Sequence, residues 1–396
     1  TPKPSSAASD VYKRQATPSS GQTYPGSVTF SAKINGGYGA GQFISFYNGA
    51  ALLGNATADG SGTASLTLSS LNAGIYNITA KFAGDTNNNA ATSPFLSYVV
   101  SLGTQAGLTI SGVPGIVTYG DTPFQLSANG GTGNGSISYS SSNTGVLTVN
   151  GSGTVAVVGA GHATITVTKA ADANYNAQSQ TVDITVVPKA LNATITPNGK
   201  VYNTTTPATV SGITYNGLAY TDTASNVYIS GGSLSFSDKN AGTGETVTAS
   251  GYTLAGGKAA DYVLGTITVN HADISPATLT VTNTAVQDKP YDGTTAATFS
   301  GTPTLSGVLS NDNVTLTGGT AAFVGKDCMP IPVPVILSGF GLNGTDAANY
   351  TLTQPAPAFA SIQPQTLDVS VSPVTILCGH CLLYTSPSPR DMRRSR

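Results

Sequence analysis

Hydrophobic and polar residues alternate with a period of two along most of the chain. The alternation is clear in 28–34, 76–82 and 163–167, where Val, Phe, Tyr, Ala and Ile are each followed by a polar or small residue. It places every second side chain on one face of a strand. Two such faces packed together form a sandwich core about 10 Å thick. Gly/Asn-rich segments such as 129–135 mark the turns between strands. No helical stripe exceeds a turn or two, so we predict an all-β fold.

A second, longer period divides the chain into blocks. A junction phrase recurs around Pro188, Pro276 and Pro364, with spacings of 276 − 188 = 88 and 364 − 276 = 88 residues. A further step of 88 back reaches Val100, where one group of strands also gives way to the next. Blocks of this size match single domains. We therefore predict tandem immunoglobulin-like β-sandwich domains in an elongated array, each with a core of its own.

The blocks resemble each other in pairs. In the third and fourth, 260–264 (ADYVL) corresponds to 348–352 (ANYTL), and in the first and second, 84–90 corresponds to 171–177. The predicted organisation is a non-native segment, 1–15; repeat 1, 16–101, whose first strand can be missing; repeat 2, 102–188; repeat 3, 189–276; repeat 4, 277–364; the first strand of a truncated fifth repeat, 365–380; and a second non-native segment, 381–396.

Both ends of the chain read like translated sequencing adapters. Ser5–Gln15 is SSAASDVYKRQ and Cys381–Asp391 is CLLYTSPSPRD. Codons that encode Asp10–Gln15 are the reverse complement of codons that encode the start of the second run. One adapter on both sides of an insert gives this relation, as expected of a fragment from a metagenomic library. We therefore expect the biological chain to be 16–380.

Charge and cysteine content exclude several classes of function. Residues 16–380 contain no arginine, nine lysines and sixteen acids, a net charge of 9 − 16 = −7. Nucleic acids and anionic membranes require clustered Lys and Arg, so neither is an expected partner. No run approaches the ~18 apolar residues of a membrane span. Cys328 and Cys378 are too few for a disulfide framework. The CxxC of Cys378–Cys381 spans the predicted adapter boundary, and we interpret it as coincidental.

Several motifs resemble known bacterial repeats. The segment 71–85 resembles the closing strands of a bacterial Ig-like repeat, and 119–167 resembles the Ig-like modules of large bacterial surface proteins. Repeats 3 and 4 resemble the repeat named after its Tyr-Asp-Gly motif, which is Tyr291-Asp292-Gly293 here, although repeat 3 has Tyr202-Asn203-Thr204. The resemblance implies long secreted, adhesin-like proteins in which such repeats provide spacing and presentation.

Two similar loops are the candidate metal sites. Alternating oxygen-bearing side chains can wrap a calcium ion, and they occur in Asp85, Asn87 and Asn89 and again in Asp172, Asn174 and Asn176. The sixth position lacks the glycine of a calcium loop, and no Glu follows at the twelfth, so we favour ordinary turns in which Asp bonds to its own backbone. Calcium at domain junctions, through Asp121, Asp222 or Asp346, remains an alternative, and no other cofactor is expected.

Catalytic candidates are sparse. Asp288, Tyr291 and Asp292 could bind a sugar, but an Asp-Gly turn with Tyr291 at the edge of the sandwich is the favoured interpretation. Glu245 is the only glutamate, and His162 and His271 lie in a loop and at a repeat end. Acid–base catalysis needs carboxylates placed together, and none recur in that way. We predict that the chain is not an enzyme.

The predicted function is structural. We expect a stalk or spacer segment of a secreted bacterial surface adhesin-like protein, extracellular or at the cell surface, that presents a distal binding region. Its expected partners are neighbouring repeats, with glycans or host-surface ligands bound by other regions. The alternative is a carbohydrate- or ice-binding accessory module, which would need a flat face bearing Tyr215, Tyr220 and Tyr228.

Overall fold

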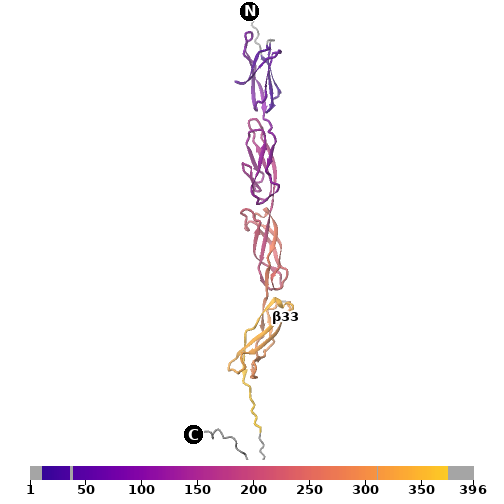
Figure 1. The fold of residues 1–396 in the computed structure, drawn as a ribbon, viewed down its shortest axis with the longest axis vertical. Coiled ribbons are helices and arrows are strands. Elements are labelled where there is room, and N and C mark those ends of the chain that lie inside the picture. Colours follow the sequence, from indigo (N-terminus) through magenta and orange to yellow (C-terminus); the bar gives the residue numbers. More distant parts are fainter. Residues whose placement is uncertain (1–10, 36–38, 310, 373–396) are drawn as a thin grey trace, which may run out of the picture. The chain divides into compact units, whose positions relative to one another are not determined.

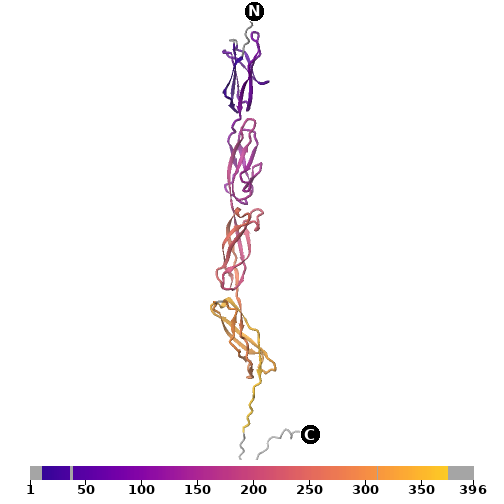
Figure 2. The same cartoon turned by 180° about the vertical axis from the view of Figure 1, so that it is seen from behind.

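The computed structural model describes residues 11–35, 39–309 and 311–372, with side chains from residue 15 onward. Apart from two 3-10 turns, η1 (Ala259–Asp261) and η2 (Ala347–Asn349), every regular element in these ranges is a β-strand. Figures 1 and 2 show these strands from opposite sides. The prediction of an all-β fold built from tandem β-sandwiches is confirmed. By internal contacts the chain forms two compact units: unit 1, which runs to Pro197 and includes Thr209–Ser235 and Val247–Asn270; and unit 2, which comprises Asn198–Ala208, Phe236–Thr246 and the chain from His271.

Repeat 1 is a sandwich of two sheets. The alternating residues of β3 point inward, so that Val28, Phe30, Ala32 and Ile34 are at most 6% exposed, and Phe46 from β4 packs against them. One sheet has the order β1 (Val11–Thr17), β3 (Val28–Ile34), β6 (Thr63–Leu68); the other has the order β2 (Gln22–Thr23), β9 (Leu96–Ser101), β7 (Gly74–Phe82), β4 (Phe43–Asn48), β5 (Ala51–Thr57), with β8 (Ala91–Thr92) beside β7.

Strand β1 includes part of the segment that the sequence assigns to an adapter. Gln15 lies opposite Ser31, and Arg14 lies opposite Ala32, in an antiparallel pair with β3. Backbone N–H and C=O groups form this ladder whatever the side chains are. The pairing therefore does not bear on the origin of residues 1–15, which stays a prediction.

The core of repeat 1 contains a buried hydroxyl without a partner. Tyr98 is 2% exposed, and its ring meets Phe30 edge to face at 5.3 Å. Among the described residues nothing accepts a hydrogen bond from its Oη. An unpaired buried polar group costs about 1–3 kcal/mol. We expect Tyr98→Phe to leave the stability unchanged or raise it by about 1 kcal/mol in urea unfolding, and a loss of more than about 1 kcal/mol would contradict this packing.

Repeat 2 and most of repeat 3 complete unit 1. The strands of repeat 2 form three sheets: β10 (Leu108–Ser111) with β13 (Ser127–Gly130); β11 (Val117–Thr118), β18 (Gln178–Val187), β17 (Gly161–Lys169), β14 (Ile137–Ser141); and β12 (Phe124–Gln125), β16 (Thr154–Val157), β15 (Leu147–Val149). Repeat 3 begins with the sheet β22 (Val210–Asn216), β19 (Lys189–Pro197), β26 (Tyr262–Val269), and its other long strands are β23 (Tyr228–Phe236) and β25 (Val247–Ala255).

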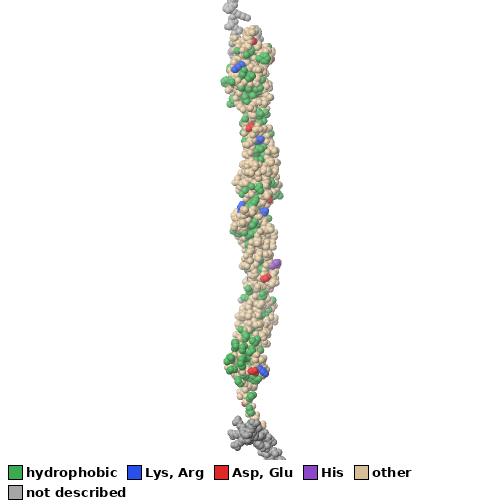
Figure 3. Space-filling view, turned by 60° about the vertical axis from the view of Figure 1, so that its left-hand side comes forward, with side chains coloured by type: hydrophobic (Ala, Val, Ile, Leu, Met, Phe, Trp, Pro, Cys, Tyr) green, Lys and Arg blue, Asp and Glu red, His purple; other side chains and the backbone are tan. Residues whose placement is uncertain are grey.

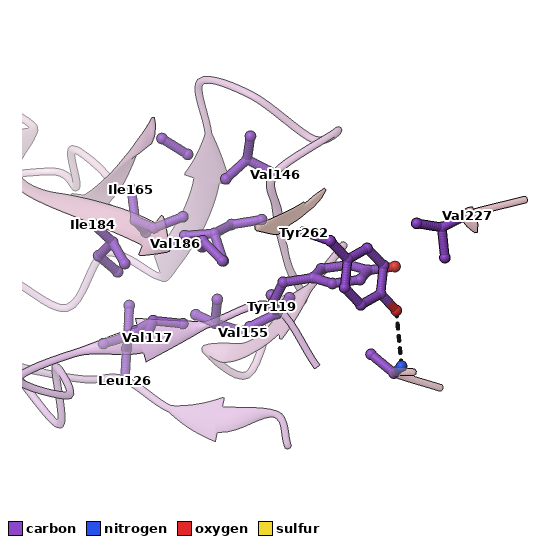
Figure 4. Packing of buried hydrophobic residues seen from close by; sticks show 14 of the residues in the cluster. Val117, Tyr119, Leu126, Val146, Val155, Ile165, Ile184, Val186, Val227 and Tyr262 are labelled. Carbon is purple, nitrogen blue, oxygen red and sulfur yellow. Dashed lines mark hydrogen bonds between the residues drawn. The ribbon is translucent and has the colours of Figure 1, made fainter. Parts of the chain in front are cut away.

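The hydrophobic core of repeat 2 continues into repeat 3. One cluster of buried residues contains Leu147 and Ile165 from repeat 2 together with Leu191, Val227 and Tyr262 from repeat 3. In Figure 4, Tyr262 and Tyr119 lie side by side between the valines and isoleucines of repeat 2 and Val227. The expectation of a separate core for each block therefore fails at residue 188, because aromatic rings fill the space where the two repeats meet.

Unit 2 contains repeat 4 and several short strands of repeat 3, including its last strand. Phe323, Val335 and Phe340 are at the centre of its core, and β33 is labelled in Figure 1. Its sheets are β20 (Lys200–Val201), β27 (Ala272–Ser275), β24 (Gly242–Glu245); β31 (Thr304–Ser306), β28 (Ala277–Thr282), β34 (Tyr350–Thr353); β29 (Lys289–Pro290) with β36 (Ile362–Gln363); and β30 (Ala296–Ala297), β32 (Thr315–Phe323), β33 (Val333–Asn343), β35 (Ala358–Ala360). Residues 364–372 form no strand.

Candidate functional site

Tyrosine pairs mark the three places where one repeat follows another. In each pair a ring from the earlier repeat meets a ring from the later repeat edge to face, a geometry worth about 0.5–1.5 kcal/mol beyond the buried area. The first two pairs belong to unit 1 and the third to unit 2. The pairs, with their centroid distances and interplanar angles, are Tyr24–Tyr175 at 5.2 Å and 87°, Tyr119–Tyr262 at 5.4 Å and 80°, and Tyr202–Tyr350 at 5.5 Å and 77°.

The first tyrosine of each pair is placed by the sheet. It directly follows a two-residue strand (β2, β11 or β20) that runs parallel to the last strand of its repeat (β9, β18 or β27). Its N–H then donates to the carbonyl that ends or follows the ladder. These bonds join Tyr24 to Ser101 at 3.0 Å, Tyr119 to Val187 at 2.9 Å and Tyr202 to Ser275 at 2.8 Å. We call this end of a repeat its C-terminal pole.

The second tyrosine of each pair directly follows an Asn or Asp that caps the earlier repeat. The Oδ1 atom of that residue accepts the backbone N–H of an alanine in a loop of the earlier repeat. The bonds join Ala73 to Asn174 at 2.9 Å, Ala160 to Asp261 at 2.7 Å, and Ala241 to Asn349 at 2.8 Å. Turns η1 and η2 end on Asp261 and Asn349, which are 9% and 4% exposed. A buried N–H without an acceptor is costly, so these contacts fix the register of the two repeats.

Repeats 3 and 4 add a carboxylate to the pair. Asp222 Oδ2 accepts hydrogen bonds from the hydroxyls of Tyr119 and Tyr262, at 2.9 and 2.7 Å. The Tyr262 hydroxyl in turn accepts the N–H of Ala219 at 2.8 Å, the bond drawn in Figure 4. Hydrogen bonds from two hydroxyls to one carboxylate oxygen are charge-assisted, and such bonds are stronger than hydrogen bonds between neutral groups.

The same arrangement recurs in unit 2. Asp312 Oδ2 accepts from Tyr202 at 2.9 Å and from Tyr350 at 2.5 Å. The Tyr350 hydroxyl accepts the N–H of Leu309 at 3.1 Å. Lys239 Nζ lies 3.9 Å from the other oxygen of Asp312, whose side chain is only 3% exposed. The recurrence shows that one local design joins repeat 2 to repeat 3 and repeat 3 to repeat 4.

A lysine and a third ring reinforce the contact in unit 1. Lys258 Nζ lies 2.9 Å from Asp261 and 5.2 Å from the centroid of the Tyr119 ring. The hydrogen bond to Asp261 raises the pKa of Lys258 above its usual value. Tyr220 stacks edge to face on Tyr119 at 5.7 Å and donates to the carbonyl of Asp121 at 2.7 Å. Tyr119 is thus held on several sides.

The tyrosines that donate to Asp222 or Asp312 should titrate late. Burial, followed by the hydrogen bond to Asp222 or Asp312, raises the pKa values of Tyr119, Tyr262, Tyr202 and Tyr350. A raised folded-state pKa means that stability is complete below the unfolded value of about 10 and is lost as the pH rises above it. We expect these phenols to ionise only as the chain unfolds in alkali, which near-ultraviolet absorbance and circular dichroism can follow together. The chain has no tryptophan to obscure the signal. Ionisation of all tyrosines before unfolding would contradict the burial.

The first calcium candidate, the loop that begins at Asp85, is a turn in which the Asp85 carboxylate accepts hydrogen bonds from the backbone of its own loop. Asp85 Oδ1 accepts the N–H groups of Asn87 and Asn88, both at 2.7 Å, and Gln42 donates to Oδ2 at 2.9 Å. The backbone bond from Asn87 is the largest cause that lowers the pKa of Asp85. Both carboxylate oxygens thus have protein donors, as in a turn in which Asp bonds to its own backbone.

The second calcium candidate belongs to the junction between repeats 1 and 2. Asp172 Oδ1 accepts the N–H groups of Asn174 and Tyr175, both at 2.8 Å. This turn presents Asn174 to Ala73, and Asn176 donates its N–H to the carbonyl of Gly103 at 2.9 Å. Within the described ranges no three His, Cys, Asp or Glu side chains converge as metal ligands. A calcium role for either loop stays a prediction.

The remaining acidic candidates make local backbone contacts. Asp292 Oδ1 accepts from Lys289 Nζ and from the Thr294 N–H, both at 2.9 Å, and the Lys289 bond is the main cause that lowers the pKa of Asp292 to about 2. Gly293 has a φ of 77°, as the Asp-Gly turn requires. The other contacts are Asp288 with the Ser361 N–H at 2.6 Å, Asp121 with the Thr118 N–H at 2.7 Å, and Asp346 with the Asn313 N–H at 2.8 Å.

The structure brings two of the residues named for catalysis near each other and not the third. Glu245 on β24 lies opposite Ala272, the residue after His271, whereas His162 is on β17 in unit 1. Both histidines are exposed. Of the proposed tyrosine face, Tyr220 turns to Asp121 and Tyr215 receives the Ile229 N–H at 3.1 Å. Tyr228 alone of the three has no such bond, and it is 39% exposed. Two of the three tyrosines are thus used inside unit 1.

Figure 3 shows that most of the described surface on that side is neither charged nor hydrophobic, with hydrophobic side chains gathered on unit 2. In unit 2, Val324 directly after β32, Ile336 on β33 and Phe359 on β35 are 61%, 45% and 66% exposed. The described part of the chain has no helix with the length and hydrophobicity of a membrane span.

Family profiles match four parts of the chain. The bacterial Ig-like domain (group 3) matches 15–101, and the intimin immunoglobulin-like domain matches 119–171. The YDG domain matches twice, at 187–269 and 275–358. The curated proteins include no match.

Solved structures with similar folds come from several proteins. They include a C-terminal 282-residue fragment of intimin in complex with the intimin-binding domain of its receptor, at 20% identity and a TM-score of 0.20, covering 47% of this chain and 66% of that one. A Ca²⁺-stabilised adhesin with which an Antarctic bacterium binds ice has 13% identity and a TM-score of 0.23, covering 91% and 99%. Fibronectin(III)-like modules of Clostridium thermocellum CbhA have 18% identity and a TM-score of 0.18, covering 42% and 88%. Likeness at this level says nothing of ligand or partner. From the four profile matches, the chain is a tandem series of bacterial Ig-like and YDG repeats, the repeat types of adhesin-like proteins.

Proposed function

We propose that the chain is a structural spacer, a stalk segment of a secreted bacterial surface protein that presents a distal binding region. The observation that supports this proposal is that acidic and phenolic side chains, the groups most able to act in catalysis or binding, are engaged in contacts between repeats. Asp222, Asp312, Asp261 and their tyrosine neighbours bond across the junctions, where they hold one repeat to the next.

The properties of a spacer follow from these contacts. A flexible linker changes its end-to-end distance freely, because its residues do not contact one another. Repeats joined by buried rings and paired polar groups resist such bending, since each junction must lose several bonds before it opens. The match to adhesin-type repeats supports an extracellular, non-catalytic role.

Presentation can be tested on a surface. A small binding domain of known ligand is fused to one end of the chain, and the other end is anchored beneath a polymer layer. We expect the chain to support capture of ligand-coated beads better than a Gly/Ser linker with the same number of residues. Equal capture by the linker would contradict a spacer role.

Ligand binding by the chain itself is the competing function. The purified chain is applied to a glycan array, and we expect no selective signal. Selective binding that is lost in Tyr228→Ala would overturn the proposal and favour an accessory binding module.

A further inference from the structure

Repeat 4 carries the first part of a junction at its own C-terminal pole. Tyr291 follows β29, which runs parallel to the last strand, β36, and its N–H donates to the carbonyl of Gln363 at 2.8 Å. This is the position that Tyr24, Tyr119 and Tyr202 hold in repeats 1 to 3. Each of those three meets a tyrosine of the next repeat, whereas the Tyr291 hydroxyl has no hydrogen-bond partner among the described residues and its side chain is only half-buried.

The second part of the junction is also present. Ala241 lies five residues after Phe236, and Cys328 lies five residues after the equivalent Phe323. The Ala241 N–H donates to Asn349, whereas the described part of the chain offers no acceptor to the Cys328 N–H. The Cys328 N–H is therefore available to donate a hydrogen bond to an Asn or Asp of a following repeat.

A lysine occurs at the equivalent position near the C-terminal pole of repeat 3 and of repeat 4. Lys239, three residues after Phe236, lies 3.9 Å from Asp312 of the next repeat. Lys326, three residues after Phe323, is exposed, and no acidic side chain within the described ranges lies within ion-pair distance of it. The C-terminal pole of repeat 4 therefore has a cation, an N–H donor and a phenol at positions equivalent to those of Lys239, Ala241 and Tyr202 in repeat 3.

The chain that leaves this pole has the pattern of a strand without its sheet. Leu367 and Val369 lie 88 residues after Leu279 and Val281 of β28. Leu279 and Val281 are 0% and 8% exposed, whereas Leu367 and Val369 are 82% and 88% exposed. Burial of these two side chains would be favourable, and the hydrophobic face of a further sandwich would bury them as β28 buries Leu279 and Val281.

We propose that the C-terminal pole of repeat 4 is a docking surface for a further repeat of the same kind. The partner is defined by three groups at the spacings of repeat 4: an Asp equivalent to Asp312 that receives Tyr291 and Lys326, an Asn or Asp equivalent to Asn349 that accepts the Cys328 N–H, and a tyrosine equivalent to Tyr350 that stacks on Tyr291.

The same comparison excludes repeat 1 as the partner. Asn87 and Asn88 lie 87 residues before Asn174 and Tyr175, so an asparagine stands where the second tyrosine is required. A second copy of this chain should therefore not dock head to tail through repeat 1. The inference rests on junction geometry and would survive the failure of the spacer role.

An extended chain tests the docking surface. Residues 1–363 are joined to a second copy of 276–363, and hydrogen exchange is measured at the Cys328 amide. We expect exchange to slow at least about tenfold relative to the unextended chain, because an amide held in a docked junction exchanges only when the junction opens. Replacing the Asn349 equivalent in the added copy by Ala should restore the original rate.

Two controls keep the result decisive. Slow exchange of core amides in the added copy shows that it has folded, and a chain extended with residues 16–101 should leave the Cys328 rate unchanged. If the added copy folds and the Cys328 amide exchanges as fast as before, the proposal is wrong. It is equally wrong if the copy of 16–101 slows the exchange as much.

Discussion

Replacing Tyr119 by Ala is expected to lower the free energy of unfolding of the 102–276 region by about 4 kcal/mol, the range for deleting a buried aromatic ring. Tyr119 is 2% exposed and meets the rings of Tyr262 and Tyr220, the ammonium of Lys258 and the carboxylate of Asp222. The variant removes all four contacts and leaves Asp222 with one hydroxyl fewer.

Urea unfolding with hydrogen-exchange mass spectrometry measures this loss, because peptides from repeats 2 and 3 report separately. Tyr228→Ala is the matched control, since Tyr228 is 39% exposed and lies on a strand of repeat 3. Its expected loss is below about 1 kcal/mol. Tyr119→Phe should lie between the two, at about 1.5 kcal/mol, because only the hydrogen bond is lost. Equal losses in Tyr119→Ala and Tyr228→Ala would contradict the junction.

Replacing Asp312 by Ala is expected to cost about 3 kcal/mol, because it leaves the hydroxyls of Tyr202 and Tyr350 without their acceptor in a buried site. Asp312→Asn keeps an oxygen that can accept a hydrogen bond and should cost less, about 1 kcal/mol.

The titration of the tyrosines provides a second readout. The bond to Asp312 and its charge both contribute to the raised pKa values of Tyr202 and Tyr350. In Asp312→Asn the charge is gone while burial remains, so both tyrosines should ionise at a lower pH than in the wild type, although still above about 10. Unchanged tyrosine titration would show that Asp312 does not face these rings.

The strands could be predicted from the sequence, whereas the contacts between repeats could not. Alternation in 28–34 identified β3 and its buried face, because a period of two leaves no other arrangement for those side chains. It could not show that Leu147 and Tyr262 belong to one core, since contacts across a repeat boundary depend on how two surfaces fit.

Some of the junction residues could be identified from the sequence and others could not. Asn174-Tyr175, Asp261-Tyr262 and Asn349-Tyr350 recur at spacings of 87 and 88 residues, so an aligned Asn/Asp-Tyr pair was a signal available in the sequence. Their tyrosine partners are spaced irregularly, by 95 residues from Tyr24 to Tyr119 and by 83 from Tyr119 to Tyr202. Only the parallel pairing of the preceding two-residue strands makes these positions equivalent. Asp222, a candidate for calcium binding at a junction on sequence grounds, lies at a junction, where it accepts hydrogen bonds from tyrosine hydroxyls.

Repeat 3 shows how a departure from the motif is accommodated. Thr204 stands where repeat 4 has Gly293 and adopts a φ of 67°, close to the 77° of the glycine. The Asn203 side chain accepts the Thr205 N–H at 3.2 Å, compared with 2.9 Å for the corresponding bond from Thr294 to Asp292. The backbone turn is retained because side-chain bonds and the parallel strand hold it, at the cost of a conformation that β-branched residues rarely adopt.

The central claim is that the Asn/Asp residue before each second tyrosine holds the earlier repeat by one backbone N–H. Amide hydrogen exchange of the whole chain tests this claim directly, with residue-level resolution at Ala73, Ala160, Ala241 and Cys328. We expect slow exchange at the three alanines, whose acceptors lie in the next repeat. We expect fast exchange at Cys328, the equivalent amide, which has no acceptor among the described residues. Fast exchange at all four amides would contradict it.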